Sequence, residues 1–334
     1  MPMQQNGRTQ QALYPLLFSA SLHEKMWGGT RLRSMKGLQP DNVAVGESWE
    51  VSAMAEYPGV VENGPLAGRT LAALVAEYGS ALLGKAVTAR CGAAFPLLVK
   101  LLDTAESLSV QVHPDAVLAR KLHSCPGKSE MWYVLDAAPG ACIYLGFNTP
   151  VTPDELRRHA VAGTICDVLN KIEAHKGDAF FIPAGCVHSL GAGLLIAEIQ
   201  QSSDITYRLY DFGRPRELHL DQAVEAVDYT CSSYSVLPSI RLSDGVCRLV
   251  NNDCFTVNEL SFTSSLRRDL LDYGSFVLCL CVEGECIVRT AQPDTAVLLP
   301  FGRSVLLPAN MTSYTVESVS QCGGAKVLEC YMVQ

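Results

Sequence analysis

Apolar and polar residues alternate from Leu108 to Pro114, a pattern that predicts a β-strand with one buried face. Side chains two apart on a strand point to the same face, so Gln111 and His113 are expected to project together. An amide oxygen and an imidazole nitrogen side by side are half of a metal-binding cage. We therefore searched the rest of the sequence for the other half.

Other apolar runs predict further strands. They are Phe95–Leu102, Met131–Asp136, Gly177–His188 and Leu194–Gln200. Helices are expected at 71–78 after Thr70, at 114–123, and after Thr152, where Pro153 and Glu155 complete an N-terminal capping pattern. Many strands, few helices, and turns of Gly and Pro between them favour an antiparallel barrel or sandwich.

An internal repeat indicates two related β units. The run Lys176–Ala184 is matched by Phe301–Ala309, since both place a Gly, an apolar strand and Pro-Ala at the same positions. His188 falls opposite Ser313 in this alignment, and no His follows His219. We expect a catalytic unit over residues 1–234, with helical insertions, and a second unit over residues 235–334 without metal ligands.

Composition narrows the class of protein. The 334 residues are 48% hydrophobic and 18% charged, which is a globular composition. A net charge of −8 without a basic stripe argues against a nucleic-acid partner, although a small phosphorylated ligand needs only two or three cations. No apolar run is long enough to span a membrane. The apolar stretch 12–20 is short and contains Pro15, so it is not interpreted as a signal peptide.

Cysteine usage favours a reducing compartment. The 13 Cys residues are odd in number and include no Cys-x-x-Cys pair, so we expect reduced thiols in the cytoplasm. Cys279 and Cys281 lie in an apolar run and are interpreted as small core residues.

Four residues are candidate metal ligands: Gln111, His113, Glu130 and His188. Each also has an ordinary structural interpretation, as a strand-surface amide, a turn cap, a solvated loop charge and a hydrogen-bonded core histidine. Together they fall at strand ends or adjoining turns of the first β unit. Two imidazoles, a carboxylate and an amide oxygen suit Zn²⁺, with Mn, Fe, Co and Ni as competitors.

Some charged residues lie within predicted strands, among them Glu47, Glu50 and Lys100. Glu47 and Glu50 are expected on a solvated strand face. Lys100 either extends along its strand to the surface or reaches into a polar cavity, and the pattern does not decide between them.

Eight short motifs, in order along nearly the whole chain, carry a family resemblance. They are Glu24–Gly29, Gly46–Glu50, Pro96–Lys100, Ser109–Pro114, Gly127–Tyr133, Pro183–His188, Glu198–Asp204 and Thr206–Asp211. The sequence resembles the small bacterial type I mannose-6-phosphate isomerases, zinc enzymes of the cupin superfamily. One departure is Ser129, where Thr is expected.

The resemblance implies a mainly β fold of two cupin-type antiparallel β-barrel (jelly-roll-like) units with a few short helices. It implies reversible conversion of mannose 6-phosphate to fructose 6-phosphate, with one Zn²⁺ per chain. His113, Glu130 and His188 match the family's zinc ligands, and Gln111 matches the amide that often joins them. The other matches are Arg208 as active-site arginine and Glu198, Lys100, Lys128 and Ser109 as pocket residues. We expect a monomer or weak homodimer.

The reaction requires a base and a stabilised enediolate. Glu198 is the candidate base, because it is the single charge in an apolar run and burial would raise its pKa. It is alternatively the structural partner of a cation such as Arg208, or a zinc-bound water relays the proton. Arg208 suits either the phosphate, with Lys128 or Lys100 adding charge, or the enediolate.

Two other classes of protein remain possible from the residues alone. A cupin dioxygenase would use two His and one carboxylate on Fe(II). A non-catalytic sugar-binding cupin would keep the pocket without turnover. The amide at Gln111 and the cations at Lys128 and Arg208 favour a sugar phosphate over the dioxygenase.

Overall fold

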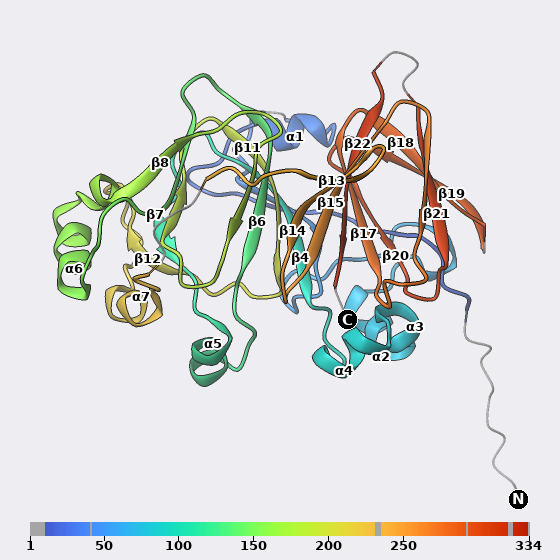
Figure 1. Cartoon of the computed structure of the whole chain (residues 1–334), viewed down its shortest axis with the longest axis horizontal. Helices are drawn as coiled ribbons and strands as arrows, with labels where there is room; N and C mark the ends of the chain where they lie inside the picture. The colour runs from blue at the N-terminus through green and yellow to red at the C-terminus, as the bar shows by residue number, and fades with distance from the viewer. Residues whose placement is uncertain (1–10, 41, 231–234, 292, 320–322, 333–334) are drawn as a thin grey trace, which may run out of the picture.

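The computed structural model describes residues 11–40, 42–230, 235–291, 293–319 and 323–332. Its strands form two β units side by side, the first mostly teal, green and yellow and the second mostly orange and red in Figure 1. Every strand pairing in the four sheets is antiparallel. The prediction of a mainly antiparallel β protein is confirmed.

The first unit consists of two sheets. The six-stranded sheet has the order β2 (Ser21–His23), β3 (Glu47–Val51), β4 (Leu97–Asp103), β11 (Leu194–Gln201), β6 (Glu130–Ala137) and β9 (Ala179–Ile182). The five-stranded sheet has the order β12 (Tyr207–Tyr210), β5 (Val110–Val112), β10 (His188–Leu190), β7 (Cys142–Phe147) and β8 (Leu169–Glu173).

The second unit repeats this strand order. Its larger sheet runs β1 (Leu16–Leu17), β20 (Ser304–Leu307), β17 (Val277–Glu283), β22 (Ala325–Tyr331), β15 (Thr256–Phe262), β14 (Val246–Asn251) and β13 (Ile240–Ser243). Its smaller sheet runs β16 (Ser265–Asp269), β21 (Ser313–Ser318), β18 (Glu285–Ala291) and β19 (Asp294–Pro300). The sequence repeat predicted above falls on β9 and β20, which hold equivalent places. Each unit is an open pair of sheets, since no sheet of the described residues closes on itself.

Helices lie at the edges of the two units. They are α1 (Arg31–Met35), α2 (Leu71–Tyr78), α3 (Ser80–Leu83), α4 (Lys85–Cys91), α5 (Ala116–His123), α6 (Pro153–Ala162) and α7 (Leu220–Ala226), with short 3₁₀ turns at Gly64–Leu66 and Ile165–Val168. Among the described residues, no helix has the length and apolar character required to cross a membrane.

The predicted helix starts are confirmed by their caps. Thr70 accepts a hydrogen bond from the Ala73 amide at the start of α2. Thr152 and Glu155 form a reciprocal capping box on α6. The helix expected at 114–123 begins two residues later, because Asp115 is its N-cap and accepts from the Leu118 amide at 2.7 Å.

The largest core cluster joins the two units. It contains Leu97 and Val99 of β4 together with Leu278 of β17 and Leu328 of β22, all at most 2% exposed. Burying such a side chain stabilises the fold by about 1.5–3 kcal/mol. Elements from the first third of the chain also contact the second unit, because β1 pairs with β20 and α2 to α4 lie beneath its strands (Figure 1). The division at residues 234 and 235 stays a prediction.

One sequence expectation about a charged strand residue is wrong. Glu50 is 3% exposed rather than solvated. Its carboxylate accepts from the Ser48 hydroxyl at 2.6 Å and lies 2.7 Å from the Lys36 ammonium, so it is a buried structural ion pair. Cys279 and Cys281 are fully buried, as expected.

Candidate metal centre and adjoining cavity

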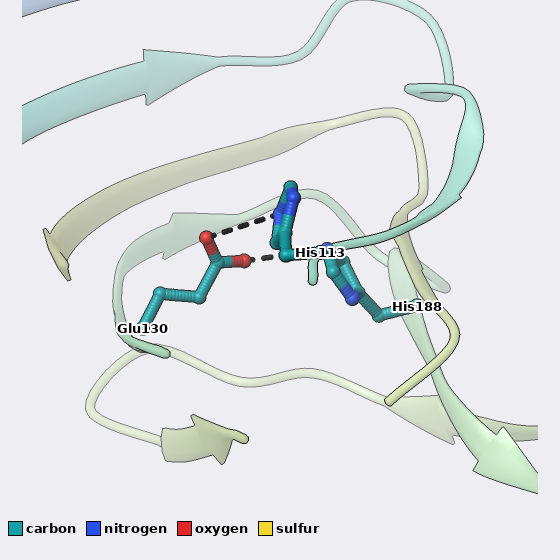
Figure 2. A group of neighbouring side chains, drawn as sticks. All are labelled: His113, Glu130 and His188. Carbon is teal, nitrogen blue, oxygen red and sulfur yellow. Dashed lines mark ion pairs between the residues drawn. The ribbon is translucent and has the colours of Figure 1, made fainter. Parts of the chain in front are cut away.

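Three buried side chains from three different strands meet in the first unit (Figure 2). His113 directly follows β5, Glu130 begins β6 and His188 begins β10. The Glu130 carboxylate lies 3.4 Å from Nε2 of His113 and 3.3 Å from Nε2 of His188. The three ligand atoms lie within 4.8 Å of one another. Three of the four predicted ligands are therefore brought together by the fold.

Hydrogen bonds orient both imidazoles toward the carboxylate. Nδ1 of His113 lies 2.9 Å from the Ile205 carbonyl, and Nδ1 of His188 lies 2.9 Å from the Cys186 carbonyl. A carbonyl can only accept, so each Nδ1 carries the proton and each Nε2 presents a lone pair to the centre. Burial lowers the pKa of His113 to about 3, with Lys128 acting in the same direction, and burial also lowers the pKa of His188. Both rings are neutral at pH 7, which is the ligating form.

Besides the two imidazoles, the Glu130 carboxylate has the Lys128 ammonium as a neighbour at 3.0 Å. Both oxygens of Glu130 are buried and accept no hydrogen bond from the described residues. Burial by itself raises the pKa of Glu130, but Lys128 and the two histidines outweigh it and hold the pKa well below its usual range. An ionised carboxylate with free lone pairs beside two imidazole nitrogens fits a divalent metal ion.

The fourth predicted ligand lies next to the other three. Gln111 on β5 is directly opposite His188 on β10, and its amide nitrogen is 3.2 Å from Nε2 of His188. A half-turn of the amide exchanges its nitrogen and oxygen, so the same side chain can present an acceptor to a cation. Ser109 is buried beside it and its hydroxyl donates to the Gln111 oxygen at 3.2 Å.

A polar cavity of about 260 Å³ adjoins the centre. Its lining comprises Lys25, Trp27, Glu47, Lys100, Leu102, Leu108, Ser109, Gln111, Lys128, Glu198, Asp204, Thr206, Arg208 and Arg216. Every predicted pocket residue is in this set. Lys128 connects the cavity to the centre, because its ammonium is 3.0 Å from Glu130 and 3.0 Å from Nε2 of His113.

Glu198 is buried at the cavity wall and is 4% exposed. It accepts from the Trp132 indole at 2.9 Å and lies 3.6 Å from the Lys100 ammonium. Burial and the nearby Glu130 charge raise the pKa of Glu198, against the opposing effect of Lys100 and Lys128. Its cationic partner in the structure is thus Lys100, whereas the alternative named from the sequence was Arg208.

Lys100 reaches into the cavity and is 4% exposed, which resolves the two interpretations of its strand position. Its ammonium lies 3.9 Å from Glu47, 3.6 Å from Glu198 and 3.7 Å from Asp204, and 4.8 Å above the Trp49 ring. These carboxylates outweigh the effect of burial and raise the pKa of Lys100. The lysine is therefore a fixed positive charge inside the cavity.

The expectation that Glu47 is solvated is wrong. Its side chain is 14% exposed and lines the cavity between Lys25 and Lys100. Burial alone would raise its pKa, but Lys100, Lys25 and a hydrogen bond from the Trp49 indole lower the pKa of Glu47 to about 2. Strand periodicity missed it because the face interpreted as solvent is covered by charged side chains of other strands.

Arg208 extends from β12 directly opposite Gln111 of β5. Its Nη1 donates to the Glu217 carbonyl at 2.6 Å, and its buried Nε has no partner among the described residues. Burial lowers the pKa of Arg208, and the neighbouring Arg216 charge acts in the same direction. Arg216 was not predicted, because it lies beyond the last motif that carries the family resemblance. Lys25, Glu47 and Asp204 lie inside such motifs, which was the signal available for them.

Comparison with known proteins identifies the family. Residues 16–136 match the family model described as phosphomannose isomerase type I, catalytic domain. The chain is 33% identical over 323 residues to a mannose-6-phosphate isomerase of Streptococcus mutans, covering 95% of this chain and 99% of that protein. It is 32% identical over 320 residues to the mannose-6-phosphate isomerase ManA of Bacillus subtilis, covering 92% and 97%.

A solved structure agrees with this match over the whole chain. The crystal structure of a mannose 6-phosphate isomerase from Bacillus subtilis aligns with a TM-score of 0.83 and 30% identity, covering 95% of this chain and 99% of that one. A second, from Archaeoglobus fulgidus, has a TM-score of 0.77 at 24% identity and supports the fold. The chain belongs to the type I mannose-6-phosphate isomerase family.

Proposed function

We propose that this protein is a metal-dependent aldose–ketose isomerase that interconverts mannose 6-phosphate and fructose 6-phosphate by proton transfer through an enediol(ate). The observation that carries the proposal is the position of the His113, Glu130 and His188 centre beside a polar cavity with a buried glutamate, Glu198, in its wall. The names of the relatives support the choice of substrate.

The ion we propose is one Zn²⁺ per chain, held by His113, Glu130, His188 and Gln111, with other divalent metals as substitutes. Two imidazoles with a carboxylate and an amide oxygen form a donor set that zinc accepts. When bound, the ion supplies Lewis-acid polarisation of a sugar oxygen, which makes the adjacent C–H more acidic.

Glu198 is the proposed base. Its raised pKa brings the carboxylate closer to working pH, and Lys100 at 3.6 Å keeps a deprotonated fraction available. The carboxylate would take the proton from C2 of the opened aldose and return it to C1 on the same face. The indole of Trp132 at 2.9 Å fixes the carboxylate position during both transfers.

The cations of the cavity would bind the negatively charged groups of the substrate. Arg208 lies opposite Gln111, hence beside the proposed ligands, where a guanidinium can steady the negative enediolate. We propose Lys128, Lys100 and Ser109 as substrate-binding residues, since all three line the cavity next to the metal centre. The two lysines supply positive charge and Ser109 a hydroxyl group to the sugar.

The test is a coupled isomerase assay on protein of measured metal content. Chelation should abolish isomerisation and Zn²⁺ should restore it, because the polarising ion is lost and replaced. Full activity in a verified metal-free sample would contradict the proposal, and so would oxygen uptake in place of sugar conversion.

We propose catalytic and companion units at residues 1–234 and 235–334, a monomer or weak homodimer, and a cytoplasmic location. None of the eleven described cysteines is in a disulfide, which supports a reducing compartment. Light scattering and a non-reducing gel would test the oligomeric state and the thiols.

A further inference from the structure

The cations that line the cavity differ in how far their charge is already neutralised. All three lysines have carboxylate partners: Lys25 with Glu47 at 3.4 Å, Lys100 with Glu198 at 3.6 Å and Lys128 with Glu130 at 3.0 Å. Lys100 also has Glu47 and Asp204 within 3.9 Å. A dianionic group placed beside these lysines would meet the carboxylates as well, so this wall is a poor phosphate site.

The cavity lining also contains two arginines, Arg208 and Arg216, and a third arginine, Arg214, shares a carboxylate partner with Arg216. Arg208 has a carbonyl partner, and its buried Nε has no partner among the described residues. Arg214 and Arg216 share one buried carboxylate, Asp211, and only Arg214 has a second acidic partner, the exposed Glu106 at 3.6 Å. Within ion-pairing distance, these three guanidinium groups have two carboxylates among the described residues, and Glu217 is a further negative charge near Arg208.

Arg216 is held firmly in the cavity lining. Its Nε and Nη2 donate to the two oxygens of Asp211 at 2.7 and 2.6 Å. This bidentate hydrogen bonding fixes the plane of the guanidinium. The loop that carries it is anchored to β12 at its far end, because the His219 amide donates to the Arg208 carbonyl at 2.8 Å. An arginine whose orientation is fixed before binding loses little conformational entropy on contact with an anion.

We propose that Arg216 determines specificity for phosphorylated sugars by binding the phosphate group, and that Asp211 is the positioning residue that holds Arg216 at the cavity. The inference rests on the proposed function, since it assigns the phosphate end of the same substrate. It also gives the two arginines different roles: Arg208 lies opposite Gln111 beside the proposed ligands, and Arg216 is a second guanidinium in the cavity lining.

The neighbouring Arg214 provides a matched control. It has the same charge and the same partner Asp211, but its Nη2 donates to the Ser107 carbonyl at 2.7 Å and it does not line the cavity. Arg216→Gln and Arg214→Gln therefore remove equal charge from one cluster, and only the first removes a group that can contact the substrate.

The experiment measures kcat and KM for mannose 6-phosphate and the inhibition constant of inorganic phosphate in the zinc-loaded protein. Arg216→Gln should raise both KM and the phosphate inhibition constant by roughly 10–100-fold, with kcat within about threefold, as expected for a lost charged hydrogen bond that acts in binding. Arg214→Gln should leave both constants within about threefold of wild type.

Asp211→Asn tests the positioning role. The substitution keeps every arginine but weakens the bidentate contact between Arg216 and residue 211. KM and the phosphate inhibition constant should therefore rise together by roughly 3–10-fold at unchanged kcat. A merely structural role would instead lower kcat and the zinc content and leave KM and the phosphate inhibition constant unchanged.

Two results would overturn the proposal. One is Arg216→Gln with KM and phosphate inhibition within about twofold of wild type. The other is an equal rise in Arg214→Gln, which would assign the effect to general charge. If the wild-type protein does not isomerise mannose 6-phosphate, the proposed function fails separately. Calorimetric titration of inorganic phosphate into the wild type and both variants then decides on Arg216, since equal affinities would refute it.

Discussion

The two β units place a glutamate at the same point and use it differently. Glu198 of β11 lies opposite Lys100 of β4 and Trp132 of β6. Glu329 of β22 lies opposite Asn258 of β15 and Cys279 of β17, which are the equivalent strands. Both carboxylates are buried.

The two carboxylates differ in their surroundings. Glu198 faces a cavity, with Trp132 and Lys100 as its partners on the other sides. Glu329 accepts five hydrogen bonds from side chains of the second unit: two from Arg268 and one each from Tyr273, Tyr314 and Asn258. The first is a candidate base because it has unused acceptor capacity beside a cavity. The second is a structural anchor because its acceptor capacity is already used.

The strand register also shows which residues of the second unit lie at the positions of the candidate metal ligands. His188 begins β10 opposite Gln111, and Ser313 begins β21 opposite Asp269. Glu130 of β6 lies opposite Ile182, whereas the second unit has Val277 opposite Leu307. The sequence alignment that set His188 against Ser313 is consistent with these strand positions, and the second unit has the apolar Val277 at the position of Glu130.

The second unit has an apolar residue at the position of the cavity-lining Glu47. Glu47 of β3 lies opposite Leu102, and the equivalent position opposite Leu260 is Val246, which is 1% exposed. Both units therefore contain buried charge, but in the second unit the buried Glu329 is paired with Arg268, whereas the first unit places Glu47 in the lining of a polar cavity.

The largest expected effect comes from the histidine that the second unit lacks. In His188→Ala we expect loss of bound metal and a fall in activity of at least roughly 10³-fold, because several kcal/mol of charge stabilisation disappear with the ion. Metal analysis and the coupled assay measure both. Ser313→Ala at the equivalent position is the control and should change neither. Stoichiometric metal in His188→Ala would show that the wrong ligand was assigned.

The paired glutamates should respond in opposite ways to removal of charge. Glu198→Gln is expected to keep metal and substrate binding but lower kcat by roughly 10²–10⁴-fold, as for loss of a general base. Glu329→Gln should keep kcat and lose roughly 3 kcal/mol of unfolding free energy, because Arg268 is left with a weaker partner. Denaturant unfolding and steady-state kinetics give the two readouts. Similar kinetic loss in both variants would end the distinction.

Glu47 should make the first unit sensitive to acid. Its pKa is about 2 in the folded protein against 4.5 ordinarily, so the folded state binds fewer protons in between and stability falls as pH drops through this window. The full contribution, present above pH 4.5, is about 3 kcal/mol at most. In Glu47→Gln we expect a shallower loss of unfolding free energy between pH 5 and 2 by roughly that amount, measured in urea. An unchanged pH slope would contradict the buried-charge account.

The smallest effect is a pH dependence of turnover set by Glu198. A base acts in its deprotonated form, so kcat/KM should fall about tenfold per pH unit below the pKa of Glu198, which burial and Glu130 raise above 4.5. The acidic limb should be missing from the residual activity of Glu198→Gln. Metal content must be constant across the range, and an unaltered limb in that variant would assign the titration to another group.

Local features were predicted well because their causes are local. Alternation at Leu108–Pro114 and the caps at Thr70 and Thr152 depend on neighbours within four residues, and the structure confirms the strand and both helices. The interpretation of Glu47 and Glu50 as solvated failed, because their partners Lys100 and Lys36 come from other elements.

By itself the sequence determined the main strands of the first unit, three of the helices, the repeat of two β units and a set of chemically suitable residues with a family resemblance. Only the tertiary structure decided which buried charges face a cavity. Glu198 and Glu329 lie in similar apolar runs. Glu198 is beside Lys100 and lines the cavity, whereas Glu329 is enclosed by Arg268 and Tyr314. The physical reason is that a carboxylate's pKa and role depend on atoms within a few ångströms, and those atoms arrive from strands far apart along the chain.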